Sequence, residues 1–183
     1  MWRLALLFGW ATSALGQEVT ELRGHGGPVM DLEVSGDGRS ALSASFDNSV
    51  GLWSLETGEG VWLEGHEAAV KSVTFLGPER AASGGDDFAI QLWDLSNGQA
   101  LYRLAGHQGQ VKDLAVSPDG TVLASAGWGG AIGLWDVETG APIAWLNGHS
   151  APVNAVGWID EVTLVSGSAD GTLRTWDTER QEQ

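Results

Sequence analysis

The chain has 183 residues and a formal net charge of −15, from 24 acidic and 9 basic side chains. The length is sufficient for one domain with a sizeable core. A surface this acidic repels phosphate groups, which argues against nucleic acid or an anionic membrane as a partner. The sequence contains no cysteine, which excludes disulfide bonds, zinc–thiolate sites and covalently attached haem within it.

The first 16 residues have the pattern of a secretory signal peptide. Arg3 supplies a positive charge, residues 4–11 are apolar, and the small residues that follow end at Gly16. The segment is too short to span a bilayer, and no other run reaches about 18 apolar residues. We therefore expect cleavage after Gly16 and a mature chain, residues 17–183, that is periplasmic or secreted and has no membrane span.

A unit of about 41 residues recurs four times in the rest of the chain. Each unit begins with a Gly-His pair, and a tryptophan follows about 28 residues later. The pairs are Gly24-His25, Gly65-His66, Gly106-His107 and Gly148-His149, and the tryptophans are Trp53, Trp93, Trp135 and Trp176. A period of this size indicates an array in which each unit is one supersecondary module.

Within each unit the apolar residues mark short strands. The first strands are expected near 29–34, 70–75, 111–116 and 153–158, the second near 41–45, 81–85, 122–127 and 163–168, and the third near 50–53, 90–93, 132–135 and 173–176. Fourth, outer strands are expected near 61–63, 101–104 and 143–146, with a lone outer strand at 19–22. In every first strand the apolar spacing is three and then two, which predicts a β-bulge.

Four short strands joined by tight turns form one antiparallel sheet that is apolar on both faces. Neighbouring copies are the available cover for such faces, which is the arrangement of blades in a β-propeller. The sequence therefore predicts an all-β propeller module at 17–183, with four four-stranded blades from repeats at about 19–54, 61–94, 101–136 and 143–177, either complete or part of a larger ring.

The Gly-His pairs, the period and the endings Trp93-Asp94, Trp135-Asp136 and Trp176-Asp177 resemble the WD-repeat β-propellers. The resemblance implies a hydrogen-bonded network in each blade, made of a histidine, a second-strand serine, a turn aspartate and the tryptophan. The implied sets are His25, Ser43 or Ser45, Asp47, Trp53; His66, Ser83, Asp87, Trp93; and His149, Ser166 or Ser168, Asp170, Trp176. The third repeat has His107, Ser125 and Trp135 but Gly129 in place of the aspartate, and the first has Ser54 instead of the final aspartate.

The number of repeats leaves three interpretations open. Propellers of this family usually have about seven blades. The four repeats could belong to a longer propeller, to one half of an eight-bladed homodimer, or to a closed four-bladed ring. In a closed ring, the lone strand at 19–22 would complete the last blade, which ends after its third strand.

No pattern in the sequence indicates catalysis, a cofactor or a metal site. All four histidines belong to the Gly-His pairs, and no carboxylate-flanked histidine pair with metal-ligand spacing occurs. The serines lack a nucleophile-elbow motif with a separate histidine. The expected chain is therefore not an enzyme.

A binding surface is the better candidate, on the narrow face where the resemblance implies that partners dock. The candidate residues are Met30, Phe46, Lys71, Asp86, Lys112, Trp128 and Asn154. Lys71 and Lys112 are the only lysines and fall at the same position of adjacent repeats. Aromatic rings flanked by cations suit a protein loop that carries an acidic residue.

The sequence thus predicts an exported, non-catalytic scaffold that binds another protein of unknown identity. Some exported bacterial WD-repeat proteins that this chain resembles carry a c-type cytochrome. The alternative is therefore a propeller that serves a periplasmic electron-transfer protein whose haem module is not in this chain.

Overall fold

The computed structural model describes residues 21–180, and the predicted signal peptide lies outside that range. The described residues form strands and turns throughout, which confirms the all-β class. Between residues 21 and 180 there is no helix that is long and apolar enough to cross a membrane.

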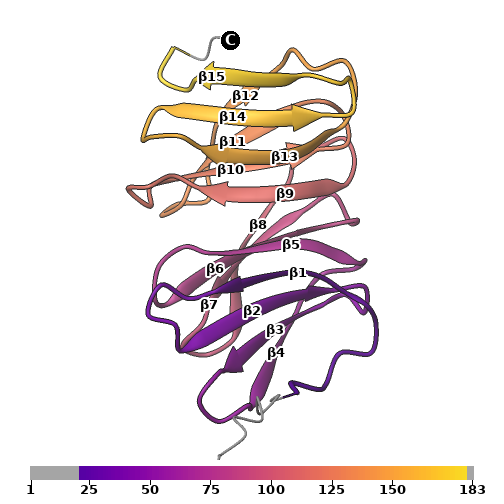
Figure 1. Ribbon diagram of the computed structural model, residues 1–183, viewed down its shortest axis with the longest axis vertical. Helices are drawn as coiled ribbons and strands as arrows, with labels where there is room; N and C mark the ends of the chain where they lie inside the picture. The colour runs from indigo at the N-terminus through magenta and orange to yellow at the C-terminus, as the bar shows by residue number, and fades with distance from the viewer. Residues whose placement is uncertain (1–20, 181–183) are drawn as a thin grey trace, which may run out of the picture.

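The strands form four consecutive antiparallel sheets, which we call the first to fourth blades (Figure 1). The first blade contains β1 (Val29–Val34), β2 (Ser40–Ser45), β3 (Ser49–Ser54) and β4 (Gly60–Glu64), and the second β5 (Val70–Phe75), β6 (Arg80–Gly85), β7 (Ile90–Asp94) and β8 (Gln99–Leu104). The third blade contains β9 (Val111–Val116), β10 (Val122–Gly127), β11 (Ile132–Asp136) and β12 (Pro142–Leu146), and the fourth β13 (Val153–Trp158), β14 (Thr163–Ser168) and β15 (Leu173–Asp177). In each blade the strands pair in chain order.

The predicted bulge is present in every first strand. The register between the first and second strands shifts between Val29 and Asp31 in β1, and at the equivalent places in β5, β9 and β13. The extra residue explains why the apolar spacing there is three instead of two.

The hydrophobic core lies between the blades. Leu42, Val50 and Leu63 of the first blade pack on Val73 and Trp93 of the second. Equivalent clusters join the second blade to the third and the third to the fourth. Each blade is therefore stabilised by covering the apolar face of its neighbour, as expected for stacked repeats.

Carboxylates on the first strands add polar contacts between blades. Asp31 accepts a hydrogen bond from the backbone N–H of Val73, at 3.0 Å, in the next blade. Asp113 accepts one from the N–H of Val156, at 2.8 Å, and one from the hydroxyl of Ser72, at 3.4 Å. Burial raises the pKa of Asp113 above its ordinary value, although these donors oppose the shift. Asp113 thus connects three successive blades.

The array is open. First strands pack in the order β1, β5, β9 and β13, and in the described part of the chain no strand of the first blade packs on the fourth. Figure 1 shows the two end blades at opposite ends of the molecule's longest axis. The interpretation as a closed four-bladed ring is therefore wrong for this structure, because the end blades never meet.

The fourth blade also differs from the prediction of four strands per blade. Within the described range it has three strands, and β15 is its edge. A lone outer strand was also predicted at 19–22. Glu21 and Leu22 are not in a strand, and residues 19 and 20 lie outside the described range. The physical reason is that the edge of β15 lies at the far end of the array from them (Figure 1).

Candidate functional site

The histidine, serine and tryptophan of each repeat meet inside the blade. In the second blade the Nε2 of His66 lies 2.7 Å from the Oγ of Ser83, and the Nε1 of Trp93 donates to the same Oγ at 2.7 Å. The other blades repeat this geometry with His25, Ser43 and Trp53, with His107, Ser125 and Trp135, and with His149, Ser166 and Trp176. The structure thus selects Ser43 over Ser45 and Ser166 over Ser168, whose hydroxyls instead donate to loop carbonyls.

A turn aspartate contacts the other ring nitrogen in three blades. The Nδ1–carboxylate distances are 2.9 Å for His25 and Asp47, 3.1 Å for His66 and Asp87, and 2.8 Å for His149 and Asp170. Each aspartate also accepts the backbone N–H that follows its histidine. Burial alone would raise the pKa of Asp87, but His66 and Arg103 hold it below its ordinary value.

This serine–histidine–aspartate chain has the connectivity of a catalytic triad, but its environment is structural. Ser83 is fully buried and already accepts the Trp93 N–H, so its hydroxyl hydrogen is directed to His66. No substrate carbonyl can approach a hydroxyl enclosed in this way. The network therefore satisfies the polar atoms of a buried tryptophan and fixes the turn.

The third blade lacks the carboxylate. Gly129 replaces the aspartate, and burial lowers the pKa of His107 to about 4. Beside the ring, a cavity of about 370 Å³ is lined by His107, Gly129, Trp145 and neighbouring residues. The imidazole therefore remains neutral at pH 7, with its Nε2 on Ser125.

The sequence analysis missed a second set of residues, on the outer strands, that covers these networks. The cross-strand pairs are Gly51 with Trp62, Gln91 with Arg103, and Gly133 with Trp145. Trp62 lies 4.7 Å from the ring of His25, and Trp145 lies 5.0 Å from that of His107. In the second blade Arg103 instead donates to Asp87 at 3.0 Å.

Alignment of the repeats on their Gly-His pairs could have found these residues, because each lies three positions before the glycine. A Cβ atom on Gly51 would lie 2.6 Å from Trp53 Nε1 and 2.7 Å from Ser43 Oγ. One on Gly133 would lie 2.8 Å from Trp135 Nε1. The glycines on the third strands therefore leave room for the hydrogen-bonded network of their own blade.

Three of the predicted binding residues, Phe46, Asp86 and Trp128, lie in the turns between second and third strands, and Lys71 and Lys112 lie near the starts of the first strands β5 and β9. We call Phe46, Lys71, Asp86, Lys112 and Trp128 the aromatic–lysine patch. Lys71 Nζ lies 4.2 Å from the ring centroid of Phe46, and Lys112 Nζ lies 5.2 Å from that of Trp128. Phe46 is 51% exposed and Trp128 is 53% exposed, so both rings present a face to solvent.

The two lysines have different surroundings despite their equivalent positions. Lys71 lies over the aromatic ring of the preceding blade and forms an ion pair with Asp86 at 3.4 Å. Lys112 lies over the ring of its own blade. Of the other two predicted residues, Met30 and Asn154 are exposed on the first strands of the first and fourth blades.

Asp86 has one unsatisfied atom. Its Oδ1 is buried and has no hydrogen-bond partner, whereas Oδ2 faces Lys71. A buried carboxylate oxygen without a donor is costly. Because the atom is buried, a partner could not donate to it unless the surrounding residues moved.

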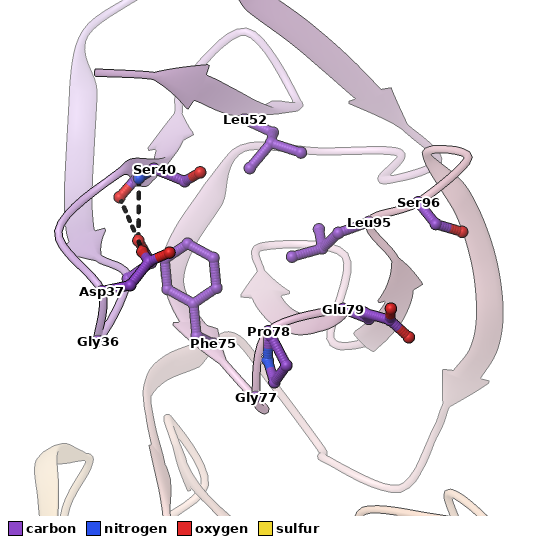
Figure 2. Close-up of a pocket in the computed structure, with 11 residues that line it drawn as sticks. Gly36, Asp37, Ser40, Leu52, Phe75, Gly77, Pro78, Glu79, Leu95 and Ser96 are labelled. Carbon is purple, nitrogen blue, oxygen red and sulfur yellow. Dashed lines mark hydrogen bonds between the residues drawn. The ribbon is translucent and has the colours of Figure 1, made fainter. Parts of the chain in front are cut away.

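The opposite end of the blades carries a second hollow, between the first and second blades. It has a volume of about 700 Å³, and Figure 2 shows the side chains of Leu52, Phe75 and Leu95 directed into it beside the turn that contains Asp37. This hollow offers apolar contact bordered by carboxylates and lacks the cations of the aromatic–lysine patch. Within residues 21–180 no group of three or more acidic or histidine side chains could hold a metal ion.

The family model described as "WD domain, G-beta repeat" matches residues 16–54, 60–94, 98–136 and 140–177. The chain belongs to the WD-repeat family. Among solved structures, this WD-repeat chain is similar to "Structure of U3-55K", with a TM-score of 0.84 and 27% identity over 88% of this chain and 52% of that chain.

Curated relatives include the ribosome biogenesis protein WDR12 homolog of Drosophila erecta, which is 29% identical over 79% of this chain and 40% of the relative. The apoptotic protease-activating factor 1 of Rattus norvegicus is 28% identical over 84% of this chain and 12% of the relative. The chain thus spans less than half the length of these curated relatives.

Proposed function

We propose that this WD-repeat module is a non-catalytic scaffold whose aromatic–lysine patch binds a protein loop carrying an acidic residue. The observation that carries the proposal is the pair of half-exposed rings, each with a lysine against its face. Aromatic and cationic side chains that are already held in place make favourable anchors, because little conformational entropy is lost on binding.

The charge distribution supports an acidic ligand group at this place. The protein carries a formal net charge of −15, so most of its surface repels acidic partners. The two lysines are concentrated in the patch, and Lys112 has its ammonium group over Trp128. Selectivity would come from this local reversal of charge.

Paired variants test the proposal. Phe46→Ser with Trp128→Ser removes both rings, and Lys71→Glu with Lys112→Glu reverses both charges. The control Val61→Ser changes an exposed residue on an outer strand. Quantitative mass spectrometry of cross-linked partners should show the same partner lost in both patch variants and retained in the control. Retention of every partner by both patch variants would contradict the proposal.

We further propose that the protein acts outside the cytoplasm, as residues 1–16 suggest. Expression with the natural N-terminus, followed by intact-mass measurement of the exported product, should give a chain that begins at Gln17. A product that keeps its first 16 residues and stays in the cytoplasm would contradict this proposal.

The alternative, a propeller that serves a periplasmic electron-transfer protein, stays a prediction. Partners cross-linked through the patch would then include a c-type cytochrome, detectable by its haem absorbance. A homodimer is also part of the proposal, and it would use the uncovered faces of the end blades instead of the patch.

A further inference from the structure

The blades that have a turn aspartate hold its carboxylate with the same three donors. In the first blade, Asp47 accepts from Nδ1 of His25 at 2.9 Å and from the backbone N–H of Gly26 at 2.6 Å. The backbone N–H of Ser49 donates to the other carboxylate oxygen at 3.0 Å. The second and fourth blades use the equivalent three donors for their own aspartates. Each of these blades thus arranges one imidazole and two backbone amides around one carboxylate.

The third blade keeps the three donors but has no aspartate to receive them. The equivalent groups are Nδ1 of His107 and the backbone N–H groups of Gln108 and Ala131, and within residues 21–180 none of them has a hydrogen-bond partner. The hydroxyl of Ser125 lies 2.7 Å from Nε2 of His107 but 3.3 Å from the carbonyl oxygen of Gly133. The hydroxyl hydrogen is therefore directed to Nε2, and the neutral ring carries its own hydrogen on Nδ1.

The cavity beside His107 brings the three donors together. It has a volume of about 370 Å³, and His107, Gln108 and Ala131 all line it. A Cβ atom on Gly129, which also lines it, would meet no atom closer than 3.7 Å. His107 itself is only 9% exposed, so water cannot surround its ring as it would in solution. The third blade thus has room for a carboxylate at the place where the other blades hold an aspartate.

Trp145 covers this cavity without closing it. Its ring lies 5.0 Å from that of His107, and in the first blade Trp62 lies 4.7 Å from His25. The first blade nevertheless holds the carboxylate of Asp47, so a tryptophan at this position leaves space for one. Trp145 is also 36% exposed, which places the cavity at the edge of the blade, where a ligand can reach it from solvent.

The charge around the cavity suits an anion, although the protein as a whole is acidic. The segments that line it, residues 105–110, 127–131 and 142–147, contain no acidic side chain, whereas the whole chain has a net charge of −15. Lys112 lies 5.2 Å from the ring centroid of Trp128, the residue directly before Gly129. Backbone N–H groups that converge on one point favour an anion, and a negatively charged acceptor strengthens each hydrogen bond.

We propose that the third blade binds a carboxylate group in this cavity, which we call the Gly129 site, through His107 Nδ1 and the backbone N–H groups of Gln108 and Ala131. The ligand is a small carboxylate anion or the side chain of an acidic residue, since both present the same pair of oxygens. The volume also accommodates a short substituent on the carboxylate. The site does not depend on the aromatic–lysine patch.

Acetate is the probe for this site, and the imidazole signals in NMR spectra are the readout. At constant ionic strength, acetate should shift the signals of His107 with a dissociation constant on the order of 10 mM. The signals of His66 and His149 should not move, because their own aspartates occupy the equivalent place. Acetamide, a neutral molecule of similar shape, should bind about tenfold more weakly.

Two substitutions of Gly129 form a matched pair. Gly129→Asp supplies an internal carboxylate and should abolish the response of His107 to acetate. Gly129→Ala adds a methyl group without a charge and should retain most of the response. Both variants should fold, because a Cβ atom at this position has sufficient space. An unresponsive His107 in the wild type, at acetate concentrations well above the expected dissociation constant, would overturn the proposal, as would an equal response in Gly129→Asp.

A second measurement identifies the source of the carboxylate. The cross-linking experiment described for the aromatic–lysine patch is repeated with Gly129→Asp and Gly129→Ala. A partner lost only in Gly129→Asp would show that an acidic side chain of the partner enters the site, whereas a retained partner would assign the site to a small free carboxylate. A wild type that ignores acetate overturns the Gly129 site alone, because the patch is tested separately by the variants of Phe46 and Trp128.

Discussion

The second and third blades contain the same histidine, serine and tryptophan but differ at one position of the turn that follows. Asp87 accepts from His66, Arg103 and the backbone of Glu67, whereas Gly129 at the equivalent place offers no acceptor. The tryptophans of both blades are almost completely buried. The comparison shows that packing of the tryptophan, and not the carboxylate, is the minimum that this repeat needs to form a blade.

The third blade has a partial substitute for the missing carboxylate. Trp145 packs edge-on against both His107 and Trp135, at 5.0 and 5.5 Å between ring centroids. The second blade has Arg103 at that position, which would lack its acceptor without Asp87. In these two blades, the outer-strand residue is an arginine where the turn has a carboxylate, and a tryptophan where the turn has a glycine. The first blade, with both Asp47 and Trp62, shows that the tryptophan also tolerates the carboxylate.

The largest expected effect is common to the two blades. Trp93→Ala should lower the free energy of unfolding by about 3–5 kcal/mol, because it opens a cavity and leaves Ser83 without its donor. Trp135→Ala should cost a similar amount. Chemical denaturation of both variants checks this, and a cost at Trp135 below about 1 kcal/mol would show that the third blade depends on other contacts.

Acid should weaken both blades, and the third more strongly. Burial lowers the pKa of both His66 and His107, but Asp87 opposes the shift at His66 and no carboxylate opposes it at His107. The folded-state pKa of His107 is about 4, below its ordinary value of 6.5. Between these pH values the unfolded chain binds a proton that the folded chain does not, so stability is fully present above pH 6.5 and falls as the pH is lowered towards 4. This difference corresponds to roughly 3 kcal/mol.

A variant without the titrating group isolates that contribution. The stability difference between the wild type and His107→Gln should shrink as the pH falls from 7 to 4, as measured by urea denaturation at each pH. A constant difference would mean that His107 does not titrate in this window.

Restoring the carboxylate should have a smaller effect of opposite sign. Gly129→Asp should stabilise the protein by about 1 kcal/mol, because the new side chain can accept from His107. A Cβ atom at Gly129 would meet no atom closer than 3.7 Å. Gly130→Asp is the matched control and should destabilise the protein, since Gly130 has φ +84° and its Cβ would lie 3.0 Å from a carbonyl oxygen. Equal melting temperatures for the two variants would contradict this prediction.

The smallest effect concerns local opening in the wild type. The amides around Gly127–Ile132 should exchange with solvent faster than those around Gly85–Ile90, because the third blade lacks the carboxylate that holds its turn. Hydrogen exchange measured by NMR checks this prediction. Equal protection in the two turns would show that Trp145 fully replaces Asp87.

The repeat pattern was sufficient to predict the strands, the bulges and the class of fold. Apolar spacing and turn residues are local properties, and the bulge at Val29–Asp31 was visible as one extra residue in each repeat. The Trp62 and Arg103 contacts could also have been predicted by comparing the repeats position by position. Apolar character alone does not reveal them, because Trp62 and Trp145 fit the apolar pattern of an outer strand and Arg103 only interrupts it.

The openness of the array could not be predicted in this way. Val29 and Leu173 are apolar in the same pattern as their buried counterparts, so the sequence does not distinguish a covered face from an uncovered one. The different neighbours of Lys71 and Lys112 were equally hidden, because they depend on which adjacent turn carries an aromatic residue. Such facts depend on the stacking of blades and not on any single repeat.

The shared carboxylate of Asp113 has a mechanical consequence. It holds Val156 on one side and Ser72 on the other, so a pull that detached the last sheet would also disturb a sheet two positions away. Loss of one donor would leave a charge with less hydration than water provides and fewer partners to offset it. Under force, the three sheets joined at this residue should therefore yield together and not peel away one after another.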